Sequence, residues 1–170
     1  MELFILRHGE AGQRSMSSDR IRALTSAGKE EILEIAKALK IIGLKFDVVV
    51  TSPLKRAHDT AMIVSNILNI GSRVQTWNEL APEGQRSEVY RKISKLREEY
   101  VVLIVGHQPL LGEIVNDIIH NGKSKPCNLL LKKWGLVRIR LLSKTKIPKG
   151  ELRWLLSPRI LRNIYKNNVK

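Results

Sequence analysis

The 170-residue sequence has little cysteine, few aromatic residues and no long apolar run. A single cysteine, Cys127, leaves no partner for an internal disulfide. The four histidines lack the paired spacing of zinc ligands, so no metal is expected. No apolar run approaches the roughly 20 residues that cross a bilayer, and the first residues lack the basic leader and small-residue cleavage site of a secretory signal. These absences predict a cytoplasmic protein without a membrane segment.

The composition predicts one domain spanning residues 1–170, with a basic last third. Apolar residues make up 43% of the chain, enough to fill the core of a single domain. Residues 120–170 hold 14 Lys/Arg against Glu151 alone, whereas residues 1–119 hold 16 against 15 Asp/Glu. A basic field of this kind attracts anions, which favours an acidic protein partner, nucleic acid or an anionic membrane surface. The alternative is a solvated surface that keeps the protein soluble.

Three apolar runs end abruptly in polar residues. Leu3–Leu6 runs into Arg7 and His8, Val48–Val50 runs into Thr51-Ser52-Pro53, and Val101–Val105 runs into Gly106 and His107. Short apolar runs with polar ends are typical of buried strands. Because ligands bind beyond the carboxyl ends of strands in open parallel sheets, we expect these three ends to meet at one pocket.

Helical patterns separate these strands. Thr25 is expected to cap a helix that ends near Gly43, and Ser52-Pro53 to begin a second helix with Arg56 in its first turn. This order of strand, helix and strand favours parallel pairs. Residues 11–22 lack periodicity and have the composition of a lid over the pocket. The remaining predicted helices are 87–99, one opened by Pro109 and one begun by Ser157-Pro158, and the remaining predicted strands are 74–77, 129–131, 136–142 and 152–156.

Two arginines and two histidines fall at these strand and helix ends, and together they suit phosphoryl transfer. The guanidinium groups of Arg7 and Arg56 bind phosphate oxygens and stay charged. We assign His8 as the nucleophile, because a neutral imidazole is nucleophilic near pH 7, and His107 as a protonated hydrogen-bond donor to the transferring group. Fixed cations supply the charge neutralisation, so neither a metal nor another cofactor is needed. A lone histidine is more often structural, and we interpret the other two, His58 and His120, in that way.

Three motifs carry a resemblance to a known family. In order and spacing they resemble the histidine phosphatase superfamily, which includes the cofactor-dependent phosphoglycerate mutases. The motifs are Leu6-Arg7-His8-Gly9-Glu10, Thr51-Ser52-Pro53-Leu54-Lys55-Arg56-Ala57 and Val105-Gly106-His107-Gln108-Pro109. Further stretches, which extend the resemblance over nearly the whole chain, are similar to the short SixA-type phosphohistidine phosphatases: Asp19 to Thr25 with Gly28, Glu79 to Pro82, and Gly150 to Pro158.

The resemblance implies a fold, a mechanism and a substrate class. The fold would be a three-layer α/β/α sandwich with a mainly parallel central sheet, phosphoglycerate mutase-like. His8 would become phosphorylated in a pocket formed with Arg7, Arg56 and His107, and Arg22 is a further candidate for substrate binding. The substrate would be phosphohistidine on a phosphorelay protein.

The chain departs from the superfamily pattern at the general acid. Mutases and phosphomonoesterases of the superfamily carry a carboxylic acid in a longer insertion after the second arginine, and here that region is short. Glu79 is the first candidate for this acid and Glu83 the second. The alternative for both is an exposed loop carboxylate without a catalytic role. An alkoxide needs a proton early, whereas an imidazole can depart already protonated, so a minimal site suits phosphohistidine.

Two alternatives stay open at this stage. The first is a phosphatase of small phosphate esters that uses Glu79 or Glu83 as its acid. The second, less favoured, is a binding module whose basic last third grips nucleic acid, with Trp134 and Trp154 stacking on bases, although tryptophans in predicted strands are more often core residues.

Overall fold

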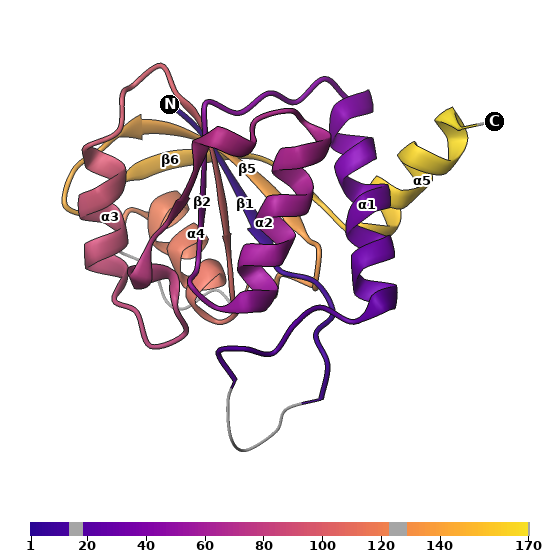
Figure 1. The fold of residues 1–170 in the computed structure, drawn as a ribbon. Coiled ribbons are helices and arrows are strands. Elements are labelled where there is room, and N and C mark those ends of the chain that lie inside the picture. The colour runs from indigo at the N-terminus through magenta and orange to yellow at the C-terminus, as the bar shows by residue number, and fades with distance from the viewer. Residues whose placement is uncertain (14–18, 123–128, 170) are drawn as a thin grey trace.

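A computed structural model describes residues 1–13, 19–122 and 129–169 of the chain, and its centre is a six-stranded mixed sheet (Figure 1). The strand order is β3-β2-β4-β1-β5-β6. The first four strands along the chain pair in parallel, and β5 and β6 run antiparallel at one side. The strands are β1 (Glu2–Arg7), β2 (Val48–Thr51), β3 (Val74–Thr76), β4 (Val101–Gly106), β5 (Leu136–Ser143) and β6 (Lys149–Leu156).

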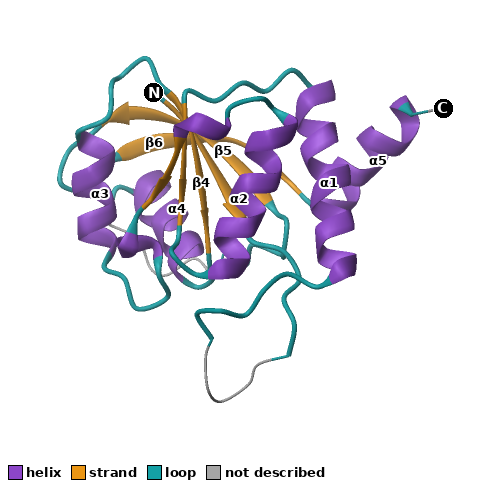
Figure 2. Cartoon of the chain, in the orientation of Figure 1, coloured by secondary structure: helices purple, strands orange, loops and turns teal. Residues whose placement is uncertain are grey.

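Five α-helices cover the two faces of the sheet, which gives the expected three layers (Figure 2). The core clusters place α1, α2 and α5 on one face, and α3 and α4 on the other. None of the helices in the described residues is both long and apolar enough for a membrane span. The helices are α1 (Ser26–Ile41), α2 (Lys55–Ile67), α3 (Arg86–Ser94), α4 (Leu110–His120) and α5 (Pro158–Asn168), with short 3-10 helices at Gly71–Arg73 and Asn78–Leu80.

Strand β1 lies in the middle of the sheet and is buried on both faces. Leu3 and Ile5 join the core under α3 and α4, while Phe4 and Leu6 join the core under α1, α2 and α5. This follows from the alternation of side chains along a strand. A continuous apolar run is therefore what this position requires, and it fixes where Arg7 leaves the sheet.

The structure differs from the sequence predictions in three places. Helix α2 begins at Lys55 rather than at Pro53, because the Ser52 hydroxyl accepts a hydrogen bond from the Leu54 N–H (3.3 Å) in a turn before the helix. Helix α3 ends at Ser94, five residues before the predicted end, since the chain must turn to enter β4. Residues 129–131 form no strand, because their carbonyl groups accept hydrogen bonds from side chains of the functional site instead.

Parts of two predictions lie outside the described residues. These are the middle of the expected lid, residues 14–18, and Cys127. The described remainder of the lid leaves β1 and projects beyond the carboxyl ends of the parallel strands (Figure 1). Its two sides meet at an isolated antiparallel bridge between Ala11 and Leu24.

Candidate active site

The three polar strand ends predicted from the sequence lie together at one edge of the sheet. Strands β2, β4 and β1 are adjacent, and the register pairs Arg7 with Gly106 and Thr51 with Val105. The residues that follow these strand ends therefore start from the same level of the sheet. His8 and His107, which follow β1 and β4, have ring centroids 4.8 Å apart.

The protonation state of His8 is set by its hydrogen bonds. Nδ1 lies 2.7 Å from the Gly9 carbonyl oxygen, which can only accept, so the ring proton is on Nδ1. Nε2 then carries the lone pair and accepts from Arg56 Nε–H at 3.2 Å. Burial is the largest cause that lowers the pKa of His8, and together with the nearby guanidinium groups it outweighs the raising effect of the Gly9 hydrogen bond, so that the pKa is about 4. His8 is therefore a neutral imidazole at pH 7, and its Nε2 is unprotonated and accepts the Arg56 hydrogen bond.

His107 is buried beside His8 and contacts the turn after β2. Its Nε2 lies 2.8 Å from the Ser52 Oγ, and its Nδ1 has no hydrogen-bond partner among the described residues. Burial, and then the neighbouring His8 and Arg56, lower the pKa of His107 to about 3. His107 is therefore neutral at pH 7 in this structure, which differs from the protonated donor expected from the sequence.

Arg56 comes from the first turn of α2, as predicted, and its side chain is only 4% exposed. Its guanidinium group bridges the nucleophile candidate and the loop after β1. Nε donates to His8, NH1 donates to the Asp19 carbonyl oxygen at 2.8 Å, and NH2 donates to Asp19 Oδ2 at 2.9 Å. The other carboxylate oxygen, Oδ1, pairs with Arg22 NH2 at 3.0 Å. Asp19 thus joins two guanidinium groups of the site.

Arg7 is positioned from the last third of the chain. Its NH1 donates to the Leu131 carbonyl oxygen at 2.6 Å, and burial lowers its pKa. Trp134 is held next to Arg7 by its backbone N–H, which donates to the Arg7 carbonyl oxygen at 3.1 Å. The Trp134 ring covers Gly9 so closely that a Cβ on Gly9 would lie 1.3 Å from it. Glycine is therefore required next to His8, and Trp134 is a core residue, as the sequence favoured.

These side chains line a cavity of about 380 Å³. Ten described residues line it: five were predicted as site residues from the sequence, and five were not assigned a role there. The predicted ones are Arg7, His8, Arg22, Arg56 and His107, and the others are Ala11, Asp19, Pro82, Gln108 and Lys133. Asp19 had one available signal, since it is the sole acidic residue of the segment 11–22.

The two candidate acids do not line this cavity among the described residues. Glu79 forms an ion pair with Lys92 at 2.7 Å, and this hydrogen bond lowers its pKa, so it is held as a carboxylate. Glu83 pairs with Arg20 on the surface at 3.3 Å. His58 and His120 lie on α2 and α4, outside the described lining. In the same described segments, no three potential metal-ligating side chains gather.

Comparisons with known proteins agree with this geometry. The family model described as "Histidine phosphatase superfamily (branch 1)" matches residues 3–82. The phosphohistidine phosphatase SixA of Escherichia coli is 35% identical over 120 residues, which cover 69% of this chain and 74% of SixA. The SixA homolog of Haemophilus influenzae is 33% identical over 135 residues, which cover 74% of this chain and 80% of that protein.

A solved structure of the protein histidine phosphatase SixA complexed with tungstate superimposes with a TM-score of 0.82 at 29% identity, covering 95% of this chain and 99% of that one. The fold, the paired histidine and arginine side chains and these relatives converge. The chain belongs to the histidine phosphatase superfamily and is a phosphatase-type hydrolase close to SixA.

Proposed function

We propose that the protein removes phosphoryl groups from phosphohistidine on a protein, through a phosphorylated His8. The observation that carries the proposal is the hydrogen bonding of His8, which leaves an unprotonated Nε2 facing Arg56 in the cavity. The similarity to SixA, which is named a phosphohistidine phosphatase, supports the substrate class. The bound tungstate in the SixA structure supports an oxyanion as the ligand.

The first step transfers the phosphoryl group to His8. The lone pair of His8 Nε2 attacks phosphorus, and the bond from phosphorus to the leaving group breaks. The Nε–H of Arg56 then donates its hydrogen bond to a phosphoryl oxygen instead of to His8. Arg7 and Arg56 balance the charge of that group, and positioning with charge neutralisation supplies most of the rate in such reactions. Water then attacks the phosphorus of phosphorylated His8, the bond from phosphorus to Nε2 breaks, and its electron pair returns to Nε2, so that neutral His8 is restored and both protons of the water leave with inorganic phosphate. No residue of this scheme needs a metal or a cofactor.

His107 contributes a neutral donor in this scheme. The Ser52 hydroxyl accepts from the Leu54 N–H (3.3 Å), and we assign its own hydrogen to His107 Nε2. The imidazole then carries its proton on Nδ1, the nitrogen without a partner among the described residues. That N–H is free to donate to an oxygen of the transferring group. An arriving dianion also stabilises the protonated form, which strengthens the same hydrogen bond.

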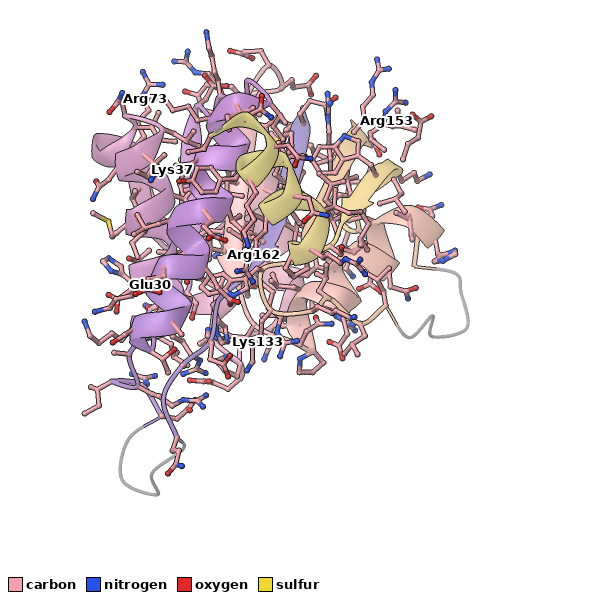
Figure 3. The ribbon with its side chains drawn as sticks, turned by 90° about the vertical axis from the view of Figure 1, so that its right-hand side faces the viewer. Glu30, Lys37, Arg73, Lys133, Arg153 and Arg162 are labelled. Carbon is pink, nitrogen blue, oxygen red and sulfur yellow. The ribbon has the colours of Figure 1, made fainter. Side chains whose placement is uncertain are left out.

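The partner that fits best is an acidic phosphoprotein. Lys133, from the basic last third, lines the cavity, and its side chain is 46% exposed where it pairs with Glu10. Figure 3 shows Lys133 at the end of the molecule where the loop after β1 projects. Basic charge at the entrance favours an acidic surface around the phosphohistidine. A small phosphate ester is the weaker candidate, because the carboxylates expected to serve it are Glu79 and Glu83, and both are ion-paired.

Replacement of the nucleophile tests the proposal. For His8→Ala we expect hydrolysis of phosphoimidazole and of a phosphohistidine protein to fall at least about 10⁴-fold, because the substitution removes the nitrogen that attacks phosphorus in this scheme. The measurement is release of inorganic phosphate in EDTA, with trapping of labelled phospho-His8 in the wild type by acid-free quench and mass spectrometry. His58→Ala is the matched control and should retain wild-type turnover. Undiminished turnover in His8→Ala would refute the mechanism.

A further inference from the structure

Asp19 places a carboxylate in the cavity that the proposed mechanism has not yet used. It is the acidic residue among the described side chains that line the cavity, whereas Glu79 and Glu83 are held elsewhere. Its side chain is 33% exposed, so it is accessible to a molecule that enters. This carboxylate therefore shares the cavity with His8 and Arg56.

The two arginines that contact Asp19 hold it as an anion. Arg56 NH2 reaches Oδ2 at 2.9 Å, and Arg22 NH2 reaches Oδ1 at 3.0 Å. Charge-assisted hydrogen bonds from guanidinium groups stabilise the ionised carboxylate. An ionised carboxylate accepts hydrogen bonds but has no proton to give. Asp19 therefore cannot protonate a departing oxygen, although it can bind an N–H group.

Arg56 also fixes how far Asp19 lies from the nucleophile. Its Nε is 3.2 Å from His8 Nε2, and its two terminal nitrogens reach Asp19 at 2.8 and 2.9 Å. One guanidinium group therefore separates the attacking nitrogen from the carboxylate. His8, Arg56 and Asp19 all line one cavity, so a phosphoryl group that replaces His8 as the hydrogen-bond partner of Arg56 Nε would lie in the same cavity as Asp19.

We propose that Asp19 is a catalytic residue that binds the ring N–H of the substrate's phosphorylated imidazolium and so selects phosphohistidine over phosphate esters. The proposal rests on the proposed function and assigns its leaving-group step. The second ring nitrogen of phosphohistidine carries a proton, and its N–H donates to the Asp19 carboxylate. The bond from His8 Nε2 to phosphorus forms while the bond from phosphorus to the substrate nitrogen breaks, and that electron pair stays on the ring. The ring departs as neutral imidazole, so no proton has to be delivered. An alkyl phosphate has no such N–H, and its alkoxide requires an acid that ionised Asp19 does not supply.

The test is Asp19→Asn, assayed with two small substrates. Phosphoimidazole has the ring N–H, and 4-nitrophenyl phosphate releases a stable phenolate that needs no proton. We expect kcat/KM for phosphoimidazole to fall about 30-fold, the worth of a charged hydrogen bond, and kcat/KM for 4-nitrophenyl phosphate to change less than about threefold. The alkaline limit of the single-turnover rate with saturating phosphoimidazole should also move to lower pH, because the imidazolium loses its anionic partner. Asp19→Glu should restore part of the selectivity.

A positioning role for Asp19 gives different results. If Asp19 only orients Arg56, Asp19→Asn should weaken tungstate binding and lower both kcat/KM values equally, and either result overturns the proposal. Unchanged or tighter tungstate binding, measured by calorimetry, supports it. Asp59→Asn is the matched control: it makes the same chemical change on the helix of Arg56, at a carboxylate that pairs with Lys55 at 3.3 Å outside the described lining. Loss of both activities in His8→Ala with wild-type selectivity in Asp19→Asn would overturn this inference while leaving the proposed function intact.

Discussion

Arg56 of the active site and Arg162 of the last third of the chain both pair with carboxylates, but the first is buried and the second is partly exposed. The Arg56 side chain is 4% exposed, pairs with Asp19 and lines a cavity with two neutral histidines. Arg162 of α5 is 35% exposed and pairs with Glu31 and Glu34 of α1 at 3.0 and 2.7 Å, where α5 passes α1 (Figure 3). A buried cation has few solvent molecules to balance it, so a phosphoryl group gains much from contacting it. An exposed pair is screened by water and salt, and contributes little.

Part of the positive charge of the last third is paired within the protein. Several cations of the last third pair with carboxylates of the first 119 residues, so the excess charge partly holds the chain together instead of forming one binding surface. These pairs are Lys133 with Glu10, Arg138 with Glu2, Lys144 with Glu98, and Arg162 with Glu31 and Glu34. Net charge alone does not show where a basic protein binds anions, because burial and pairing decide that.

The largest expected effect concerns protons on the buried histidines. The pKa values of His8 and His107 lie at about 4 and about 3, below the 6.5 of the unfolded chain. Between those limits the unfolded state binds more protons, so stability falls as pH falls below 6.5. We expect a loss of about 1.4 kcal/mol per pH unit for each histidine, measured by urea unfolding from pH 7 to 5. In His107→Asn the dependence of the free energy of unfolding on pH should lose the contribution of one histidine. An unchanged dependence would show that His107 is not buried and neutral.

The next effect concerns the contact between Gly9, next to the nucleophile, and Trp134 of the last third. Gly9→Ala would place a methyl group 1.3 Å from the Trp134 ring. The ring must move, and we expect a loss of about 1–3 kcal/mol in the free energy of unfolding, with lower turnover because His8 is the preceding residue. Gly12→Ala is the control, since a Cβ there meets nothing within 4 Å. Equal unfolding midpoints for the two variants would contradict the contact.

The smallest effect concerns the exposed charge at the entrance. For Lys133→Gln we expect kcat/KM for an acidic phosphohistidine protein to fall about threefold at low salt, with the difference lost near 0.5 M salt, because such attraction is screened. Lys149→Gln is the control: Lys149 is exposed and begins β6 opposite Ser143, at the far edge of the sheet. A similar loss in both variants would indicate attraction by net charge alone. Unchanged kcat/KM in both variants would contradict the proposal of an acidic protein partner.

Much of the fold and the positions of four candidate site residues followed from local sequence. Arg7 ends the apolar strand β1, His8 and His107 directly follow β1 and β4, and Arg56 lies in the first turn of α2. Local pattern and sheet topology were therefore enough to bring these four residues together. The partners that set their chemistry were not predictable in this way. Leu131 reaches Arg7 across 124 positions and Asp19 reaches Arg56 across 37. Such contacts depend on how loops pack, which leaves no periodic trace.

The neutral state of His107 was missed for a related reason. Spacing indicates which residues meet, but the depth at which they meet depends on the whole core. Desolvation by that core is the largest cause of the lowered pKa. The strand expected at 129–131 was wrong for the converse reason, because an apolar run there provides carbonyl acceptors to Arg7 and Gln108 rather than to a neighbouring strand.

The order of the strands has a consequence for how such a protein changes over time. Strands β2, β4 and β1, which deliver the reacting groups, are contiguous inside the sheet, and the outermost positions belong to β3 and β6. Insertions or losses at those two borders leave the spacing of the inner three untouched. Homologous proteins can therefore differ at the edge strands β3 and β6, and in the partners bound there, while they keep the same active-site chemistry.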